Sequence, residues 1–140
     1  KESNAKDHKE LLEMRSYIEA LCVRLIIEDD KDITPLYELY EHMDGHLRAN
    51  PIDFISYGEA HYLFHHTLVS LAENNLALMM FERLNLRSSM LFYHSMNTKM
   101  SSVTQNEHAK ILHLLETKSN KCEQFIISHL WKNRKKYVPR

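Results

Sequence analysis

Glycine and proline are scarce in this sequence, with two and three copies among its 140 residues. A fold of hairpins and tight turns needs more residues of these types, so long helices with short connections are expected. The sequence also lacks an apolar run near the roughly 18 residues of a membrane-spanning helix, and it lacks a signal peptide. We therefore predict one soluble, cytoplasmic, all-α domain that makes no membrane contact.

A surplus of charge of one sign is also missing. The 18 basic and 19 acidic residues nearly cancel, whereas a free-standing nucleic-acid-binding domain usually has a basic surplus. The two cysteines, Cys22 and Cys122, each fall on an apolar stripe of a predicted helix. We interpret them as buried thiols rather than a disulfide, in keeping with a reducing cytoplasm.

Apolar residues recur at helical spacing along most of the chain. Residues 1–9 are polar and aperiodic, so we predict a linker or frayed N-terminus there and a single domain over residues 10–140. Thr34 is an expected N-cap, and Thr104 with Glu107 matches a capping box. We expect an antiparallel bundle of six or seven helices, the clearest spanning about residues 10–30, 34–50, 53–72, 76–96, 101–117 and 121–136.

Histidine is abundant instead, with ten copies, and four of them fall on faces predicted to be buried. His61 and His65 are four residues apart, a spacing that lets two imidazoles on one helix face reach the same ion. His108 and His129 continue the apolar stripes of two later helices. A lone buried histidine is usually a core residue with a hydrogen-bond partner. Four on three inward faces also fit a shared metal ion, and the residues alone leave both interpretations open.

Two arginines stand out because a buried arginine needs an anionic partner. Arg87 and His94 continue the inward line of the predicted fourth helix, so both are candidates to face an effector. Arg87 fits a clamp for a ligand carboxylate or phosphate, or a salt bridge to a glutamate at the edge of the core. Arg15 lies beside the apolar stripe of the first helix and is a third candidate, although Glu19 four residues on allows an intrahelical ion pair.

Motifs of common enzyme classes are missing from the sequence. There is no glycine-rich phosphate loop, no His-Glu-x-x-His and no Gly-x-Ser-x-Gly. Glu-x-x-His is also missing, which argues against a carboxylate di-iron bundle. We therefore interpret the chain as a binding domain and not as an enzyme. The alternatives are a helical metalloenzyme with a four-histidine site and a helical interaction module whose histidines are structural.

Four short segments, taken in order, carry a family resemblance. Residues 10–15 read Glu-Leu-Leu-Glu-Met-Arg, and residues 64–68 read Phe-His-His-Thr-Leu. Residues 107–111 read Glu-His-Ala-Lys-Ile, and residues 128–130 read Ser-His-Leu. In this order they resemble the C-terminal effector domain, or FCD domain, of GntR-type transcription regulators of the FadR subgroup. The resemblance extends over about residues 10–132.

The resemblance implies a helical bundle with a central cavity that holds a divalent metal ion. Many members of the family bind the ion with an aspartate and a histidine one turn apart, plus one histidine from each of two later helices. Carried over, the three histidines are His65, His108 and His129, and the aspartate position holds His61. An all-histidine site favours zinc or nickel over harder ions, so these are the expected cofactors.

The resemblance further implies a small-molecule carboxylate effector, such as a sugar acid or a dicarboxylate. In this family a winged helix-turn-helix domain precedes the effector domain and binds operator DNA. We expect that domain to be absent from this chain, so that operator binding depends on the missing N-terminal part. We also expect a homodimer, because operators read by such proteins are usually two-fold. Effector binding would then change the spacing of the paired DNA-binding domains.

Overall fold

The structure is a computed structural model that describes residues 5–90 and 100–133. All regular elements in those two ranges are helices, so the predicted all-α class is confirmed. No helix in the same ranges is both long and apolar enough to cross a membrane. In chain order the helices are α1 (Ala5–Glu28), α2 (Thr34–Arg48), α3 (Phe54–Leu71), α4 (Asn75–Arg83), a helical segment over residues 86–90, α6 (Met100–Glu116) and α7 (Cys122–Asn133).

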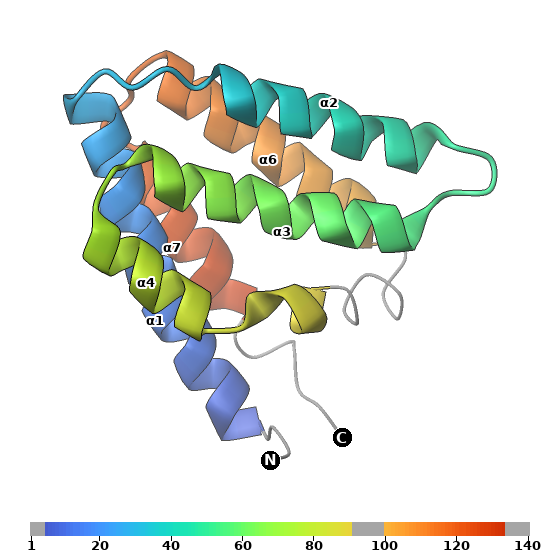
Figure 1. Ribbon diagram of the computed structural model, residues 1–140, viewed down its shortest axis with the longest axis horizontal. Helices are drawn as coiled ribbons and strands as arrows, with labels where there is room; N and C mark the ends of the chain where they lie inside the picture. The colour runs from blue at the N-terminus through green and yellow to red at the C-terminus, as the bar shows by residue number, and fades with distance from the viewer. Residues whose placement is uncertain (1–4, 91–99, 134–140) are drawn as a thin grey trace.

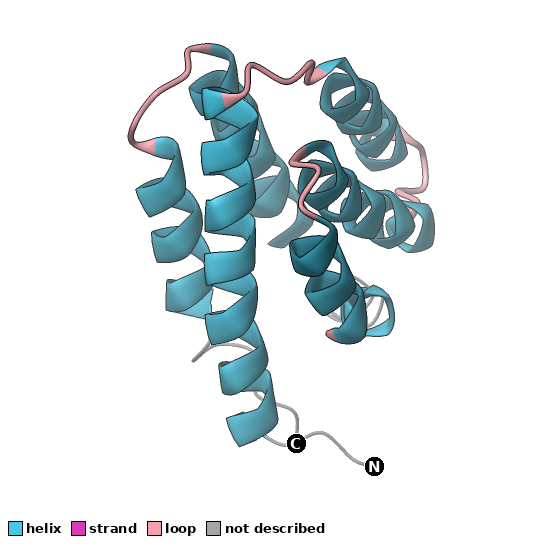
Figure 2. Cartoon of the chain, turned by 60° about the vertical axis from the view of Figure 1, so that its left-hand side comes forward, coloured by secondary structure: helices cyan, strands magenta, loops and turns pink. Residues whose placement is uncertain are grey.

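The helices form two groups that meet through α3 and α6. In the first group, α2, α3 and α6 run along the length of the molecule, and α2 is antiparallel to the other two (Figure 1). In the second group, α1 and α7 form an antiparallel pair at one end, with α4 beside α1 (Figures 1 and 2). Because α3 packs against α1, α2 and α4, it lies at the centre of the core, and its buried residues include His61 and His65.

α1 differs from the prediction in both its extent and its buried face. Residues 5–9 are helical, so this part of the predicted linker belongs to α1. Asp7 lies in the first turn, where a negative charge favours the helix dipole. The buried face carries Arg15 and Glu19, whereas Met14, which follows the apolar period, is 50% exposed. The polar pair faces inward because it has partners in the core, which are described below.

Two of the predicted N-terminal helix caps are wrong. Thr34 is the first residue of α2 and not its N-cap. The carboxylate of Asp32 instead accepts hydrogen bonds from the backbone N–H and the hydroxyl of Thr34, at 3.0 and 2.7 Å. Thr104 lies inside α6, because this helix already includes Met100. Thr104 and Glu107 therefore do not form a capping box.

The helix predicted over residues 76–96 is interrupted. Its first part is α4, where Asn74 acts as the N-cap and accepts a hydrogen bond from the N–H of Ala77 at 3.0 Å. α4 ends at Arg83, and Asn85 then adopts a left-handed backbone with φ of 53°. Asparagine tolerates this conformation better than most residues, so it ends the helix where no glycine is available.

Other helix ends also use left-handed residues that are not glycine. Asp30 follows α1 and Lys118 follows α6, and each has φ of 52°. At both ends the next backbone N–H bonds to the carbonyl five positions earlier, which is the Schellman pattern. The side chains of Asp30 and Lys118 form an ion pair of 2.6 Å. This pair joins the C-terminal ends of α1 and α6.

Candidate metal and effector site

Three buried histidines meet between α3 and α6. His61 and His65 lie one turn apart on α3, and His108 comes from α6. The three residues are 8%, 2% and 1% exposed, and their ring centroids are 4.7 to 5.0 Å apart. One nitrogen of each ring lies within 4.8 Å of the others. The fold thus brings together three of the four histidines that the sequence proposed as ligands.

The donor set of this histidine cluster fits a transition-metal ion. Neutral imidazole nitrogens are preferred ligands of zinc, nickel and copper. Two nitrogens bound to one tetrahedral zinc ion, each at about 2.05 Å, lie about 3.3 Å apart. Nε2 of His65 and Nε2 of His108 are 3.0 Å apart. Small rotations of the two rings would therefore let one ion bind both.

Glu19 of α1 borders the cluster on the Nδ1 side of His65. Its Oε1 lies 2.5 Å from that Nδ1, and its Oε2 accepts a hydrogen bond of 2.5 Å from Nε of Arg15. The intrahelical pair that the sequence allowed for Arg15 and Glu19 is thus present. Burial would raise the pKa of Glu19, but its interactions with His65 and Arg15 outweigh burial and lower it to about 2. Glu19 is therefore an anion in the core at neutral pH.

His129 of α7 does not belong to the group of three. Its Nδ1 forms an ion pair with the carboxylate of Glu107 on α6, and its ring stacks against Phe125. Burial lowers the pKa of His65, and the charge of His129 contributes to this lowering. His129 is therefore held within electrostatic reach of the histidine cluster but outside it.

Aromatic side chains pack around the cluster. Tyr57 stacks on His61 with ring centroids 6.1 Å apart, and Phe64 packs on His108 at 4.7 Å. Tyr57 and Phe64 are fully buried, and burial raises the pKa of Tyr57 well above its ordinary range. The cluster therefore lies in a low-dielectric environment, where interactions with a charged ligand are stronger than in water.

Arg87 does not face the core. Its side chain is 64% exposed, and its guanidinium donates hydrogen bonds of 2.8 to 3.1 Å to the carboxylate of Glu59 on α3. The predicted helix that would have turned Arg87 inward is interrupted at Asn85. The inward orientation predicted for Arg87 is therefore wrong, and its role toward an effector stays a prediction. His94 lies outside the described residues.

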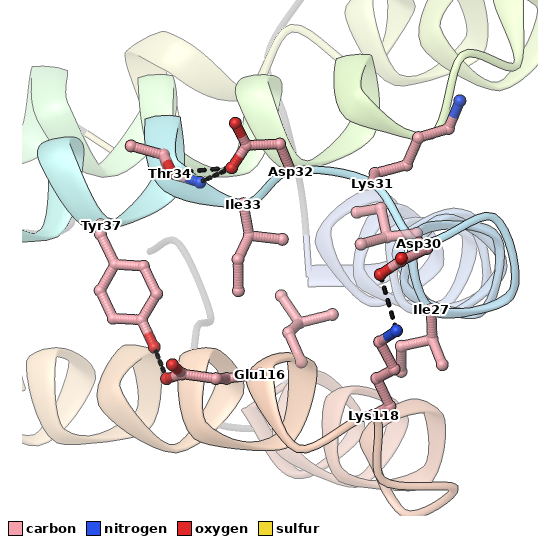
Figure 3. Close-up of a pocket in the computed structure, with 11 residues that line it drawn as sticks. Ile27, Asp30, Lys31, Asp32, Ile33, Thr34, Tyr37, Glu116 and Lys118 are labelled. Carbon is pink, nitrogen blue, oxygen red and sulfur yellow. Dashed lines mark hydrogen bonds and ion pairs between the residues drawn. The ribbon is translucent and has the colours of Figure 1, made fainter.

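A pocket of about 290 Å³ lies where α1, the α1–α2 connection and α6 meet (Figure 3). Most of its polar groups pair with one another, since Tyr37 donates to Glu116 and Lys118 pairs with Asp30 (Figure 3). None of its lining residues belongs to the histidine cluster. We therefore treat the cluster, and not this pocket, as the candidate functional site. The apolar part of the pocket lining consists of Ile26, Ile27, Ile33 and Leu115.

Sequence reasoning missed the roles of two carboxylates at this site. It treated Glu19 only as a partner for Arg15, and it assigned Glu107 to a helix cap. Both side chains bond instead to histidines, Glu19 to His65 and Glu107 to His129. For Glu19 the available signal was its position beside the apolar stripe of the first helix, since a carboxylate that reaches the core needs a donor.

Comparison with known families adds one finding. The family model described as the FCD domain matches residues 10–130 of the sequence. No curated protein and no solved structure matches the chain. The matched range runs from α1 to α7 and includes the histidine cluster, Glu19 and the pair of Glu107 and His129.

Proposed function

This chain belongs to the FCD domain family, and we propose that it senses a small organic acid with the help of a bound divalent metal ion. FCD domains are the C-terminal effector-binding domains of GntR-family regulators and are not a catalytic family. In our proposal, effector binding in the chain changes how a separate domain of the regulator binds operator DNA.

The proposed metal ion is zinc or nickel, with His61, His65 and His108 as ligands and His129 as a fourth. The observation that carries this proposal is the cluster of three buried imidazoles with nitrogens within 4.8 Å of one another. Such a donor set suits borderline metals better than magnesium or calcium, which prefer oxygen. His129 is included because Glu107 pairs with its ring on the Nδ1 side, so that Nε2 would be the nitrogen for an ion.

The proposed effector is a small carboxylate, such as a sugar acid or a dicarboxylate. A zinc ion held by histidines can accept a further oxygen ligand when its coordination expands. Arg15 is our first candidate for a second contact, because it is buried and bonded to Glu19 beside the cluster. Its guanidinium has the planar geometry that suits a carboxylate.

We also propose that the regulator is a homodimer with α1 at its interface. Met14, Tyr17 and Leu21 lie on one stripe of α1 and are 50%, 57% and 41% exposed. The stripe is self-complementary about Tyr17. An antiparallel second copy would bring Met14 next to its Leu21, and Glu10 next to its Arg24.

Metal analysis and calorimetry test the sensor proposal. We expect the purified chain to bind one zinc or nickel ion, and at least one short mono- or dicarboxylic acid to bind the metal-loaded chain. Removal of the metal with a chelator should weaken the binding of that acid by roughly tenfold or more. Failure of every acid to bind either form would contradict the effector proposal, and failure of both metals to bind would contradict the metal site.

A further inference from the structure

Glu19, His65 and His108 form a continuous hydrogen-bonded chain from α1 through α3 to α6. Oε1 of Glu19 is 2.5 Å from Nδ1 of His65, and Nε2 of His65 is 3.0 Å from Nε2 of His108. We propose that Glu19 is the positioning residue of the metal site, because it fixes a proton on Nδ1 of His65 and leaves Nε2 free for the ion. The inference rests on the proposed metal site, but its first test needs no metal.

The charge of Glu19 sets the direction of the hydrogen bonds. Arg15 donates to the second oxygen of Glu19 at 2.5 Å, and both side chains are buried. A carboxylate held in this way is ionised and can only accept, so Nδ1 of His65 must be the donor. A neutral imidazole carries one proton, so a proton on Nδ1 leaves Nε2 of His65 as an acceptor.

The same reasoning fixes the proton of His108. Since Nε2 of His65 is an acceptor, Nε2 of His108 must donate in the 3.0 Å hydrogen bond between the two rings. The metal-free chain therefore holds His65 and His108 in opposite tautomers. His65 is ready to bind an ion through Nε2, whereas His108 must first move its proton from Nε2. Metal binding should therefore change the tautomer of His108 and leave that of His65 unchanged.

The surface of α3 carries a matched pair for comparison. Nε2 of His66 lies 2.9 Å from the carboxylate of Glu82, and these side chains are 28% and 53% exposed. Water competes for this interaction, so it should contribute little to the fold. Glu82→Gln thus makes the same chemical change beside a histidine as Glu19→Gln, but outside the proposed site.

Nitrogen-15 NMR of the imidazole rings tests the tautomers in the wild-type chain, with assignments from single histidine variants. Without metal we expect Nδ1–H for His65 and Nε2–H for His108. After zinc addition both rings should show Nδ1–H. A proton on Nε2 of His65 in the metal-free chain would overturn the positioning role of Glu19, whatever the chain does with metals.

Zinc affinity, measured in competition with a chelator, tests the consequence for binding. Glu19→Gln should weaken zinc binding by roughly 10- to 100-fold, and Glu82→Gln should leave it within about twofold. Equal affinities of Glu19→Gln and the wild type would overturn the positioning role. If Glu19→Gln does not fold, the tautomer of His65 in the wild-type NMR experiment decides whether Glu19 has the positioning role. A wild-type chain that binds neither zinc nor nickel would overturn the metal site and the positioning role together.

Discussion

Glu107 of α6 and His129 of α7 form an ion pair through Nδ1 of the imidazole. A carboxylate on one ring nitrogen commonly orients the other nitrogen of a metal-binding histidine. Glu107 lies against Nδ1 of His129 as Glu19 lies against Nδ1 of His65, but only the Glu19–His65 contact has the geometry of a hydrogen bond. This similarity supports His129 as a fourth ligand, although it lies outside the group of three.

The role of His129 can be tested by substitution. His129→Ala should weaken zinc binding by roughly tenfold or more, because it removes one of four ligands. His113→Ala is the control, since His113 is exposed on α6. Zinc titration against a chelator measures both. An unchanged affinity in His129→Ala would mean that the site has three histidines.

Zinc should stabilise the fold, because its ligands come from different helices. At a free concentration a hundredfold above the dissociation constant, binding adds about 2.7 kcal/mol to the free energy of unfolding. His65→Ala and His108→Ala should lose most of this increment, whereas His42→Ala and His46→Ala on α2 should keep it. Thermal unfolding with zinc and with chelator measures the difference. Identical wild-type curves under the two conditions would instead identify the cluster as a polar core.

Glu19 should link stability to pH. Its pKa is lowered on folding from 4.5 to about 2, so its contribution is present above about pH 4.5 and is lost as pH falls toward 2. Arg15→Met removes one of the charges that lower this pKa, so acid unfolding should begin at a higher pH. Arg24→Met breaks only the exposed pair with Glu123 and should change acid unfolding little. Circular dichroism during acid titration measures the midpoints, and equal midpoints for the two variants would contradict the prediction.

Position 118, which follows α6, should tolerate glycine better than positions inside that helix. A left-handed residue with a Cβ atom costs about 1 kcal/mol, which glycine avoids. Lys118→Gly also loses the exposed ion pair with Asp30, so we expect a net gain of about 0.5 kcal/mol in the free energy of unfolding. Lys110→Gly, inside α6, should instead lose about 1 kcal/mol. Denaturant unfolding measures the free energy of unfolding of both variants. If both lost the same amount, the backbone at Lys118 would not be strained.

The exposed stripe of α1 makes the dimer testable. Tyr17→Glu would place two like charges close together at the centre of the proposed interface, so the dimer should dissociate. Ile55→Glu is the control, because Ile55 is 70% exposed on α3. Sedimentation velocity at micromolar concentration measures both variants. A dimer that survives Tyr17→Glu would place the interface elsewhere.

Most of the helices could be predicted because their signals are local. Apolar spacing and caps placed α3 over about residues 53–72, and the structure has it over Phe54–Leu71. The interruption at Asn85 could not be predicted in the same way. Apolar residues continue at helical spacing on both sides of it, and asparagine is compatible with both helical and left-handed backbone.

The candidate site was only partly predictable. His61, His65 and His108 fall on apolar stripes, so their inward positions followed from spacing alone. On α1 the same rule predicted that Met14 is buried and that Arg15 lies beside the buried face. In the structure Arg15 is buried and Met14 is exposed. Tertiary packing decides such cases, since the buried charges of α1 are stabilised by a histidine on a different helix. Helical periodicity contains no information about a partner 46 residues away.

The histidine cluster also bears on how the chain folds over time. His65 and His108 are 43 residues apart, and such contacts form only after a long loop has closed. We therefore expect that an ion that needs nitrogens from both α3 and α6 binds after the rate-limiting barrier of folding. Stabilisation that arises after the barrier slows unfolding and leaves the folding rate unchanged. A metal-loaded chain should consequently have a longer folded lifetime than the metal-free chain, although both would reach the folded state equally fast.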